Sequence, residues 1–317
     1  MSDLQLTMTF PYPQTLIHQA IDRNSLKFDF LPELNQATSS GMMRMAVLGS
    51  GSRGNATLIE YGQIRLLIDA GLSAKQLVLR MESLGVDPDS ISAILITHEH
   101  SDHAGGLDVL LRKREIPVYT NLLTREVLMH KMKSQIQWRI FQSGQKFSLG
   151  PFTIDPFSIP HDAADPVGFV LEADGIRLGS LSDVGYITDS IANRLKDCDA
   201  LALEANYDYD MLEADSRRSW ATKQRIASRH GHLSNEQTSE LVEKVHSERL
   251  KQVTLIHLSG DCNCPDLATK TMLKCLKKLK LPHTKVHAAH QDTPTDWLLC
   301  GTPQLPASEF SEQVELF

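Results

Sequence analysis

The chain has 317 residues, of which 41% are hydrophobic and 22% charged, and its formal net charge is -7. This composition is typical of a globular protein that can build a full hydrophobic core. The chain lacks the roughly 20 consecutive apolar residues of a membrane-spanning helix, and its start lacks the basic and apolar regions of a secretory signal. Because the balance of charge is acidic, binding to nucleic acid would have to depend on local basic patches or on metal ions.

The cysteines are odd in number and low in density: Cys198, Cys262, Cys264, Cys275 and Cys300. This usage favours a reducing compartment, so we expect a cytoplasmic protein. Cys262 and Cys264 lie close together, but no further ligands accompany them at suitable spacing, and we interpret both as ordinary thiols.

Residues 1–44 differ in character from the rest of the chain. Pro11, Pro13 and Pro32 interrupt them, and residues 37–41 have the composition of a linker. We expect a poorly ordered N-terminal extension at 1–44, a single globular domain at 45–300 and a C-terminal tail at 301–317.

From residue 45 onward, short apolar runs alternate with turns and amphipathic segments. The first run, 45–48, leads through a glycine-rich turn at 49–55 into strands at 56–60 and 64–69, and a helix follows over 73–84. The later predicted elements are strands at 91–97, 116–119, 201–204 and 253–257, hairpin-like runs at 147–159 and 168–181, and helices at 106–114, 122–133 and 235–248. Because strands come in runs and helices intervene singly, we expect two layered sheets with helices outside.

The strand at 91–97 ends in the motif HEHSDH, which contains His98, His100, Asp102 and His103. One ion could not use all four side chains from so short a turn without strain. Side chains two residues apart point to the same side, so we expect His98 and His100 to serve one metal ion and Asp102 and His103 a second. The alternative is a polar, solvated loop, which this density of ligand-type residues after a buried strand disfavours.

Further ligand-type residues end other apolar runs: His161, Asp183 and His257. A strand end is the rigid placement that a metal site needs. Each residue has a simpler interpretation on its own, because the histidines could be buried and hydrogen-bonded and Asp183 could cap a helix at 187–195. HEHSDH cannot fill the coordination of two ions by itself, which favours ligand roles for all three. Asp69, at another strand end, is expected to orient a ligand histidine or nearby backbone.

HEHSDH followed by an isolated His, Asp and His at strand ends resembles the metallo-β-lactamase superfamily. The turn at 49–55 and the segment 67–71 are also similar to that family's first strands. The segments 231–236 and 256–259 resemble its YycJ (WalJ) branch, which is related to RNase Z and to the phosphodiesterase PhnP. The match covers residues 45–290. It implies an α/β protein with the αββα four-layer sandwich of the metallo-β-lactamase fold, acting as a hydrolase.

The resemblance also implies how the ligands divide between two divalent ions. The ligands of the first ion would be His98, His100 and His161. Those of the second would be Asp102, His103 and His257. Asp183 would bridge the ions, because two adjacent cations need a shared anion. The mixed His and Asp set favours Zn²⁺ and leaves Mn²⁺ and Fe²⁺ open.

His232 and Glu204 are the candidates for donating a proton to the leaving group. Glu204 follows a buried strand, where a free carboxylate is costly unless it is paired. If Glu204 pairs with His232, its carboxylate would hold the imidazole in one tautomer and raise the proton affinity of that imidazole. RNase Z-like enzymes have a similar pair. Alternatively, His232 is an ordinary residue before a helix and Glu204 a structural hydrogen-bonding group.

The segment 216–235 contains no acidic residue and is rich in basic ones: Arg217, Arg218, Lys223, Arg225 and Arg229. It could grip a phosphate backbone, with Trp220 stacking on a base, or it could be a solvated helix face. The candidate substrate-binding residues are Arg225, Arg229, Ser234 and Asn235. A second lysine-rich run, 270–285, is better interpreted as the solvated face of an amphipathic helix.

The function most consistent with these features is hydrolysis of nucleic-acid phosphodiester bonds by a two-metal site, as a YycJ-like 5′→3′ DNA exonuclease. A hydrolase of the same fold acting on a small substrate, such as a cyclic phosphodiester, an acyl-thiol or a lactam, would have little use for the basic segment. A non-catalytic, metal-stabilised binding protein would normally have lost ligands that are all present here. The sequence leaves the oligomeric state open.

Overall fold

The computed structural model describes residues 41–301. The predicted extension at 1–44 and tail at 301–317 fall almost wholly outside these residues, so both stay predictions. The first described strand begins at Met43 and the last ends at Gly301. Within 41–301, no helix has the length and hydrophobicity that crossing a bilayer requires.

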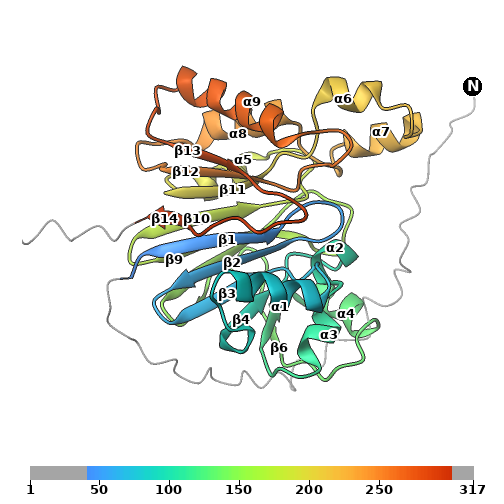
Figure 1. The fold of residues 1–317 in the computed structure, drawn as a ribbon, viewed down its shortest axis with the longest axis vertical. Helices are drawn as coiled ribbons and strands as arrows, with labels where there is room; N and C mark the ends of the chain where they lie inside the picture. Colours follow the sequence, from blue (N-terminus) through green and yellow to red (C-terminus); the bar gives the residue numbers. More distant parts are fainter. Residues whose placement is uncertain (1–40, 302–317) are drawn as a thin grey trace, which may run out of the picture. The chain divides into compact units, whose positions relative to one another are not determined.

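Two seven-stranded sheets form the centre of the fold, with helices on their outer faces (Figure 1). The first sheet has the order β14 (Leu298–Gly301), β1 (Met43–Gly49), β2 (Ala56–Tyr61), β3 (Ile64–Ile68), β4 (Ala93–Leu95), β5 (Val118–Thr120) and β6 (Trp138–Ile140). The second has the order β13 (Lys285–Ala288), β12 (Gln252–Ile256), β11 (Ala200–Glu204), β10 (Ile176–Leu181), β9 (Val167–Ala173), β8 (Phe152–Ser158) and β7 (Phe147–Leu149). The predicted αββα sandwich is therefore confirmed.

The helices divide between the two sheets. Those that follow strands of the first sheet are α1 (Ala74–Ser83), the short 3₁₀ helix η2 (Pro88–Ser90), α2 (Ser101–Ala104), α3 (Leu107–Leu111) and α4 (Leu122–Met129). Those that follow strands of the second sheet are α5 (Asp189–Leu195), α6 (Tyr209–Ala214), α7 (Trp220–Ile226), α8 (Asn235–Val245) and α9 (Pro265–Lys278). The helices α6 and α7 lie within the long connection from β11 to α8, which also contains the basic segment.

Alternation along the strands explains why both faces of each sheet are buried. In β3, Leu66 and Ile68 join the core between the sheets, whereas Leu67 joins the core under the helices. In β11, Ala202 faces the core between the sheets and Leu203 faces the helices of the other side. Strands that are apolar on both faces belong in the middle of a layered α/β structure.

The parallel strands bring their carboxyl ends to one edge of the sandwich. The pairs β3–β4 and β4–β5 are parallel in the first sheet, as are β10–β11 and β11–β12 in the second. The register pairs Leu181 with Leu203, and Glu204 with Ile256. Residues that directly follow these strands therefore meet at the same edge, where open α/β sheets usually bind their ligands.

Candidate metal centre

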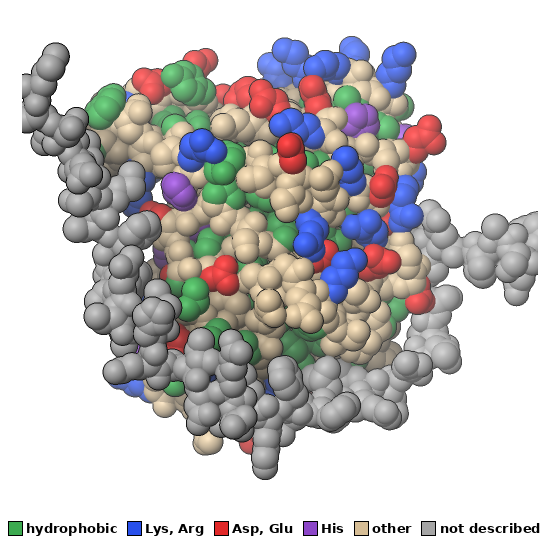
Figure 2. Space-filling model, turned by 180° about the vertical axis from the view of Figure 1, so that it is seen from behind, with side chains coloured by type: hydrophobic (Ala, Val, Ile, Leu, Met, Phe, Trp, Pro, Cys, Tyr) green, Lys and Arg blue, Asp and Glu red, His purple; other side chains and the backbone are tan. Residues whose placement is uncertain are grey.

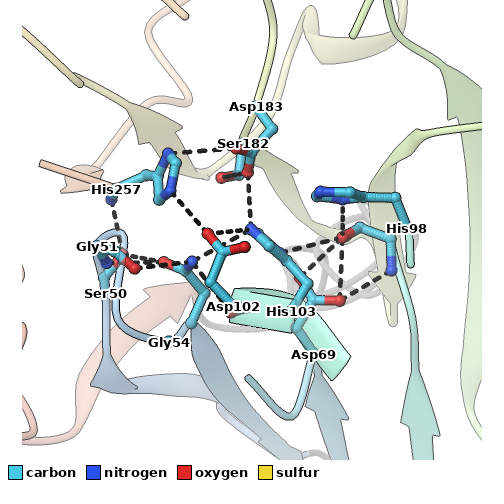
Figure 3. A network of polar contacts seen from close by, with 12 residues as sticks. Ser50, Gly51, Gly54, Asp69, His98, Asp102, His103, Ser182, Asp183 and His257 are labelled. Carbon is cyan, nitrogen blue, oxygen red and sulfur yellow. Dashed lines mark hydrogen bonds and ion pairs between the residues drawn. The ribbon is translucent and has the colours of Figure 1, made fainter. Parts of the chain in front are cut away.

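The ligand-type residues predicted from the sequence converge at this edge (Figure 3). The first sheet supplies HEHSDH after β4, with Asp102 and His103 in the short helix α2. The second sheet supplies the other three, from the ends of β8, β10 and β12: His161, Asp183 and His257. The centre thus lies between the sheets and draws side chains from both.

Three overlapping groups of these residues each bring ligand atoms within 4.8 Å of one another. The groups are His98, His100 and His161; Asp102, His103 and His257; and His98, His103 and Asp183. The first two correspond to the two ligand sets implied by the resemblance, and the third links them through Asp183.

Two of the imidazoles have a buried nitrogen without a hydrogen-bond partner, which supports a fit to metal ions. His98 contacts Thr97 Oγ1 through Nδ1 at 3.0 Å, and His257 contacts Glu204 Oε1 through Nδ1 at 2.9 Å. In both cases Nε2 is buried and has no partner in the described chain. Buried polar atoms are rarely left unsatisfied, and ligand histidines are typically held through the nitrogen that does not bind the metal.

Asp183 lies at the middle of the centre and presents a negative charge there. Its Oδ2 is 2.9 Å from His103 Nε2, and its Oδ1 is 3.8 Å from His161 Nε2. Ser182 Oγ donates a hydrogen bond of 2.6 Å to Oδ2. Burial would raise the pKa of the Asp183 carboxyl, but the charges of His257 and His103 outweigh it and hold that pKa well below its usual value. An ionised carboxylate in this position suits a bridge between two cations.

Asp69 supports the centre from behind. Its Oδ2 is 2.7 Å from His103 Nδ1, and it accepts hydrogen bonds from the backbone and the hydroxyl of Thr97. Thr97 in turn contacts His98. The carboxylate therefore orients one ligand histidine directly and a second through Thr97, which leaves His103 Nε2 directed at Asp183.

Three residues of the centre have left-handed backbone conformations. Asp69, Asp183 and His257 have φ values of 62°, 55° and 55°. Each lies just beyond the end of a strand, so the left-handed step turns the chain sharply where the strand stops. This conformation is uncommon outside glycine but is several-fold enriched in Asp and His, and such strained residues cluster at functional sites. The alternative that Asp183 caps the next helix is wrong, because Thr188 caps α5.

The glycine-rich turn packs against the centre. Ser50 Oγ accepts a hydrogen bond of 2.6 Å from the His257 backbone, and Asn55 Nδ2 is 3.2 Å from His103 Nε2. The Asn55 backbone also donates to the Asp102 carbonyl at 2.7 Å. Sequence reasoning predicted the tight turn but not these contacts, because they depend on which strands become neighbours.

We expect Gly71→Ala to destabilise the protein. A Cβ atom at Gly71 would lie 1.6 Å from the carbonyl oxygen of Asp102, so the backbone that carries a ligand would have to move. Overpacking against rigid backbone costs about 3 kcal/mol or occasionally more. Thermal unfolding would measure the loss of stability, and metal analysis would measure any loss of bound metal. The control is Gly260→Ala, where a Cβ meets nothing within 4 Å. Equal melting temperatures and metal contents for the two variants would contradict this prediction.

Glu204 joins the candidate proton donor to a ligand histidine. Its Oε1 lies 2.7 Å from His232 Nδ1 and 2.9 Å from His257 Nδ1, while Oε2 accepts from the Val184 backbone at 3.0 Å. Burial would raise the pKa of Glu204, but the charge and hydrogen bond of His232 outweigh it, so that pKa is lowered. Burial would lower the pKa of His232, but Glu204 outweighs it and that pKa is raised. The sequence predicted the Glu204–His232 contact and missed the one to His257.

Acidic side chains outside the basic segment neutralise much of its charge, one from the residue just before it and two from distant parts of the chain. Arg217 and Arg218 both form ion pairs with Asp215 and Asp261. Arg225 pairs with Asp162, at 2.5 Å between Nη2 and Oδ2, directly beside the ligand His161. The segment is therefore less positive in space than in sequence. Trp220, at the start of α7, is 75% exposed and its ring remains available for stacking.

The other candidate substrate-binding side chains have different surroundings. The guanidinium of Arg229 stacks on the ring of Tyr186 at 4.1 Å. Ser234 caps α8 in a capping box with Gln237, and Asn235 Nδ2 donates to Asn263 Oδ1 at 3.0 Å. Both Ser234 and Asn235 are buried. Both side chains already make hydrogen bonds within the protein, and their part in binding substrate stays a prediction.

The lysine-rich run lies mainly on α9. Its lysines are exposed: Lys270, Lys274, Lys277, Lys278 and Lys280. The opposite face of the helix buries Ala268, Met272 and Cys275. Figure 2 shows Lys and Arg side chains gathered along the upper edge, at the end of the domain that carries α9. This arrangement agrees with the prediction that the lysine-rich run is the solvated face of an amphipathic helix.

Comparison with known proteins agrees with the fold. The model of the beta-lactamase superfamily domain matches residues 64–258. The chain belongs to this superfamily. Within it, the chain is 36% identical over 260 residues to the exodeoxyribonuclease WalJ of Streptococcus pneumoniae serotype 2, covering 80% of this chain and 96% of that protein. It is 34% identical over 238 residues to the exodeoxyribonuclease YycJ of Bacillus anthracis, covering 74% and 90%. The predicted superfamily and its YycJ (WalJ) branch are confirmed.

Solved structures show the same fold at low sequence identity. The metallo-β-lactamase fold protein YhfI of Bacillus subtilis has a TM-score of 0.63 at 18% identity, covering 80% of this chain and 99% of that one. A diphosphatase from the PhnP family has a TM-score of 0.58 at 20% identity, covering 82% and 99%. The short form of human tRNase Z has a TM-score of 0.56 at 16% identity, covering 80% and 98%.

Proposed function

We propose that this chain is a metal-dependent 5′→3′ exodeoxyribonuclease whose catalytic domain spans residues 45–300. The observation that carries this proposal is the meeting of two ligand sets, a central carboxylate and a Glu–His pair at one edge of the sandwich. The identity of 34–36% to exodeoxyribonucleases over most of the chain supports the choice of DNA as substrate.

The residues fall into two roles. Those that would hold the two ions are His98, His100, Asp102, His103, His161, Asp183 and His257. Ions bound there would supply Lewis-acid activation of the phosphodiester and of the attacking water. Zn²⁺ suits this donor set best, and Mn²⁺ or Fe²⁺ would be accepted by the same residues.

His232 would act as the general acid. Glu204 fixes its Nδ1 and favours the protonated imidazole, so the second ring nitrogen is the one that can donate to the departing oxygen. Glu204 itself is fully buried and acts by positioning both His232 and His257. Asp69 has the same positioning role for His103.

A metal-titrated digestion assay tests this proposal. The purified chain would be given single- and double-stranded DNA and RNA, labelled at either end, beside a small phosphodiester. We expect DNA labelled at its 5′ end to release the labelled nucleotide at once, and DNA labelled at its 3′ end to shorten progressively. Digestion of the small compound alone would favour the small-substrate hydrolase, and turnover of no substrate at any metal concentration would favour a binding protein.

We expect Arg225→Glu to weaken DNA binding and to flatten its salt dependence. Arg225 is exposed and lies beside His161 through Asp162, so a carboxylate there would repel a strand entering the centre. Loss of one phosphate contact lowers the slope of log K against log salt by about 0.7 for a single strand. Fluorescence anisotropy at several salt concentrations measures this slope. The control is Lys274→Glu, on the solvated face of α9, and an equal slope in both variants would reject a role for Arg225.

A further inference from the structure

A buried arginine on α1 has no carboxylate partner within residues 41–301. Arg80, on α1, is only 8% exposed. Its Nη1 donates to the carbonyls of Leu48 and Gln291, at 2.8 and 2.9 Å, and its Nε donates to Gln76 Oε1 at 3.2 Å. These acceptors are all neutral, and within residues 41–301 Nη2 has no hydrogen-bond partner. Arginine is almost never buried unless its charge is paired. The burial of this guanidinium therefore indicates that an anion from outside the protein pairs with it.

Arg80 lines a cavity of about 380 Å³ that a second arginine also faces. The other lining residues are Arg53, Leu72, Ser73, Gln76, Gln291 and Asp292. Arg53 pairs with Asp292 at 2.8 Å, and both side chains are exposed. Two guanidinium groups and one carboxylate leave the cavity with a net positive charge.

The charge of Arg80 is not fully compensated in the protein. Burial lowers the pKa of Arg80; the charge of Asp292 acts in the opposite direction, and the smaller effect of Arg53 adds to that of burial, so the net shift is downward. Two like charges facing one cavity repel each other, and an anion between them would remove that repulsion.

The start of α1 adds backbone donors to the same cavity. Ser73 caps this helix, and its first turn contains no acidic residue. The unpaired N–H groups and the helix dipole at such an end favour a negatively charged group. The cavity therefore combines a buried cation, an exposed cation and a helix N-terminus.

The cavity adjoins the backbone of a metal-ligand residue. Leu72 in its wall directly follows Gly71, whose α-carbon packs against the Asp102 carbonyl. The Asn55 backbone, at the end of the turn that carries Arg53, donates to the same carbonyl at 2.7 Å. The turn 49–55 thus contacts the centre through Ser50 and Asn55 and lines the cavity through Arg53, so a strand that runs from the centre across this turn would pass the cavity.

We propose that the cavity formed by Arg53, Arg80, Gln76 and the first turn of α1 binds a second phosphate of the substrate strand. This inference rests on the proposed function, since it assumes that the substrate is a nucleic acid. A terminal phosphate and an internal phosphodiester share the chemistry that the cavity recognises.

Binding of an oligonucleotide to the metal-free full chain tests the inference. The probe is a ten-nucleotide oligothymidylate with a 3′ fluorophore and either a 5′-phosphate or a 5′-hydroxyl. Its binding is measured by fluorescence anisotropy. The variants are Arg53→Ala, which removes an exposed cation, and Arg80→Lys, which keeps the charge but removes the planar fork. The matched control is Arg112→Ala, which removes an exposed arginine from its pair with Asp108 on α3.

We expect both variants to weaken binding about tenfold, the value of one charge-assisted hydrogen bond, and the control to bind like the wild type. A loss confined to the 5′-phosphorylated probe identifies a terminal phosphate, and an equal loss for both probes identifies an internal one. Wild-type affinity in both variants, or no binding by the wild type, overturns the inference. If Arg80→Lys does not melt like the wild type, Arg53→Ala decides.

The digestion assay separates this inference from the proposed function. A wild-type chain that digests DNA, with variants that bind the probes normally, would overturn only the second phosphate site. A wild-type chain that binds the probes through Arg53 and Arg80 but digests nothing would overturn only the proposed function.

Discussion

Asp183→Asn is expected to lose most of its bound metal and to lower kcat by about 10³-fold or more, because metal-ion stabilisation of a phosphoryl transition state is worth several kcal/mol. The carboxylate lies between the two candidate ligand sets, 2.9 Å from His103 Nε2 and 3.8 Å from His161 Nε2. An amide has the same shape but no charge, so two adjacent cations would repel each other without a shared anion. Metal analysis of the dialysed variant and a DNA digestion assay give the two measurements.

Asp197→Asn is the matched control for this change. Asp197 also has a left-handed backbone, with φ of 58°, but it is exposed and has no place in the metal centre. The control separates the loss of charge at the centre from any effect of Asn on a left-handed turn. If Asp183→Asn kept two metal ions per chain and normal turnover, neither metal binding nor catalysis would depend on this carboxylate.

His232→Ala is expected to lower kcat on DNA by about 10²–10⁴-fold, the usual contribution of general acid catalysis, while the metal content stays normal. The deficit is expected to shrink on a p-nitrophenyl phosphodiester, because p-nitrophenolate leaves without a proton. This comparison of leaving groups distinguishes a proton donor from a residue that only supports the site.

His230→Ala is the control for His232→Ala, since His230 lies in the same loop and is exposed. Loss of metal in His232→Ala would assign this residue to the ligand set instead. An equal deficit on both kinds of substrate would contradict proton donation, because that deficit would not depend on the leaving group.

The sandwich and the meeting of the ligand-type residues could be predicted from the sequence because both depend on strong local signals. A buried strand ending in HEHSDH marks candidate ligands through their spacing alone. His161, Asp183 and His257 could be selected because each ends an apolar run, and parallel strands bring such ends to one edge. The strands β6, β13 and β14 were not predicted: they are short, and β13 has no fully buried residue, so the period-two signal is weak.

Contacts between distant segments could not be predicted from the sequence. The segment 216–235 contains no acid, yet two distant acids neutralise part of it in space: Asp261 pairs with Arg218, and Asp162 pairs with Arg225. Glu204 was paired with His232 on chemical grounds, but its contact with His257 follows from the register between β11 and β12. Arg80 carries no local signal at all, because its burial depends on loops that meet only in the folded chain.

The candidate metal ligands come from both sheets, and this division has a consequence for the lifetime of the protein. An ion held by side chains from both sheets would link the two sheets at the edge where their strands end. Ions that bind only the native form raise the free energy of unfolding, by about 4 kcal/mol at a free concentration a thousand times the Kd. Metal supply would then govern resistance to heat and proteolysis as well as turnover, and a chelator would make the chain easier to degrade even where no substrate is present.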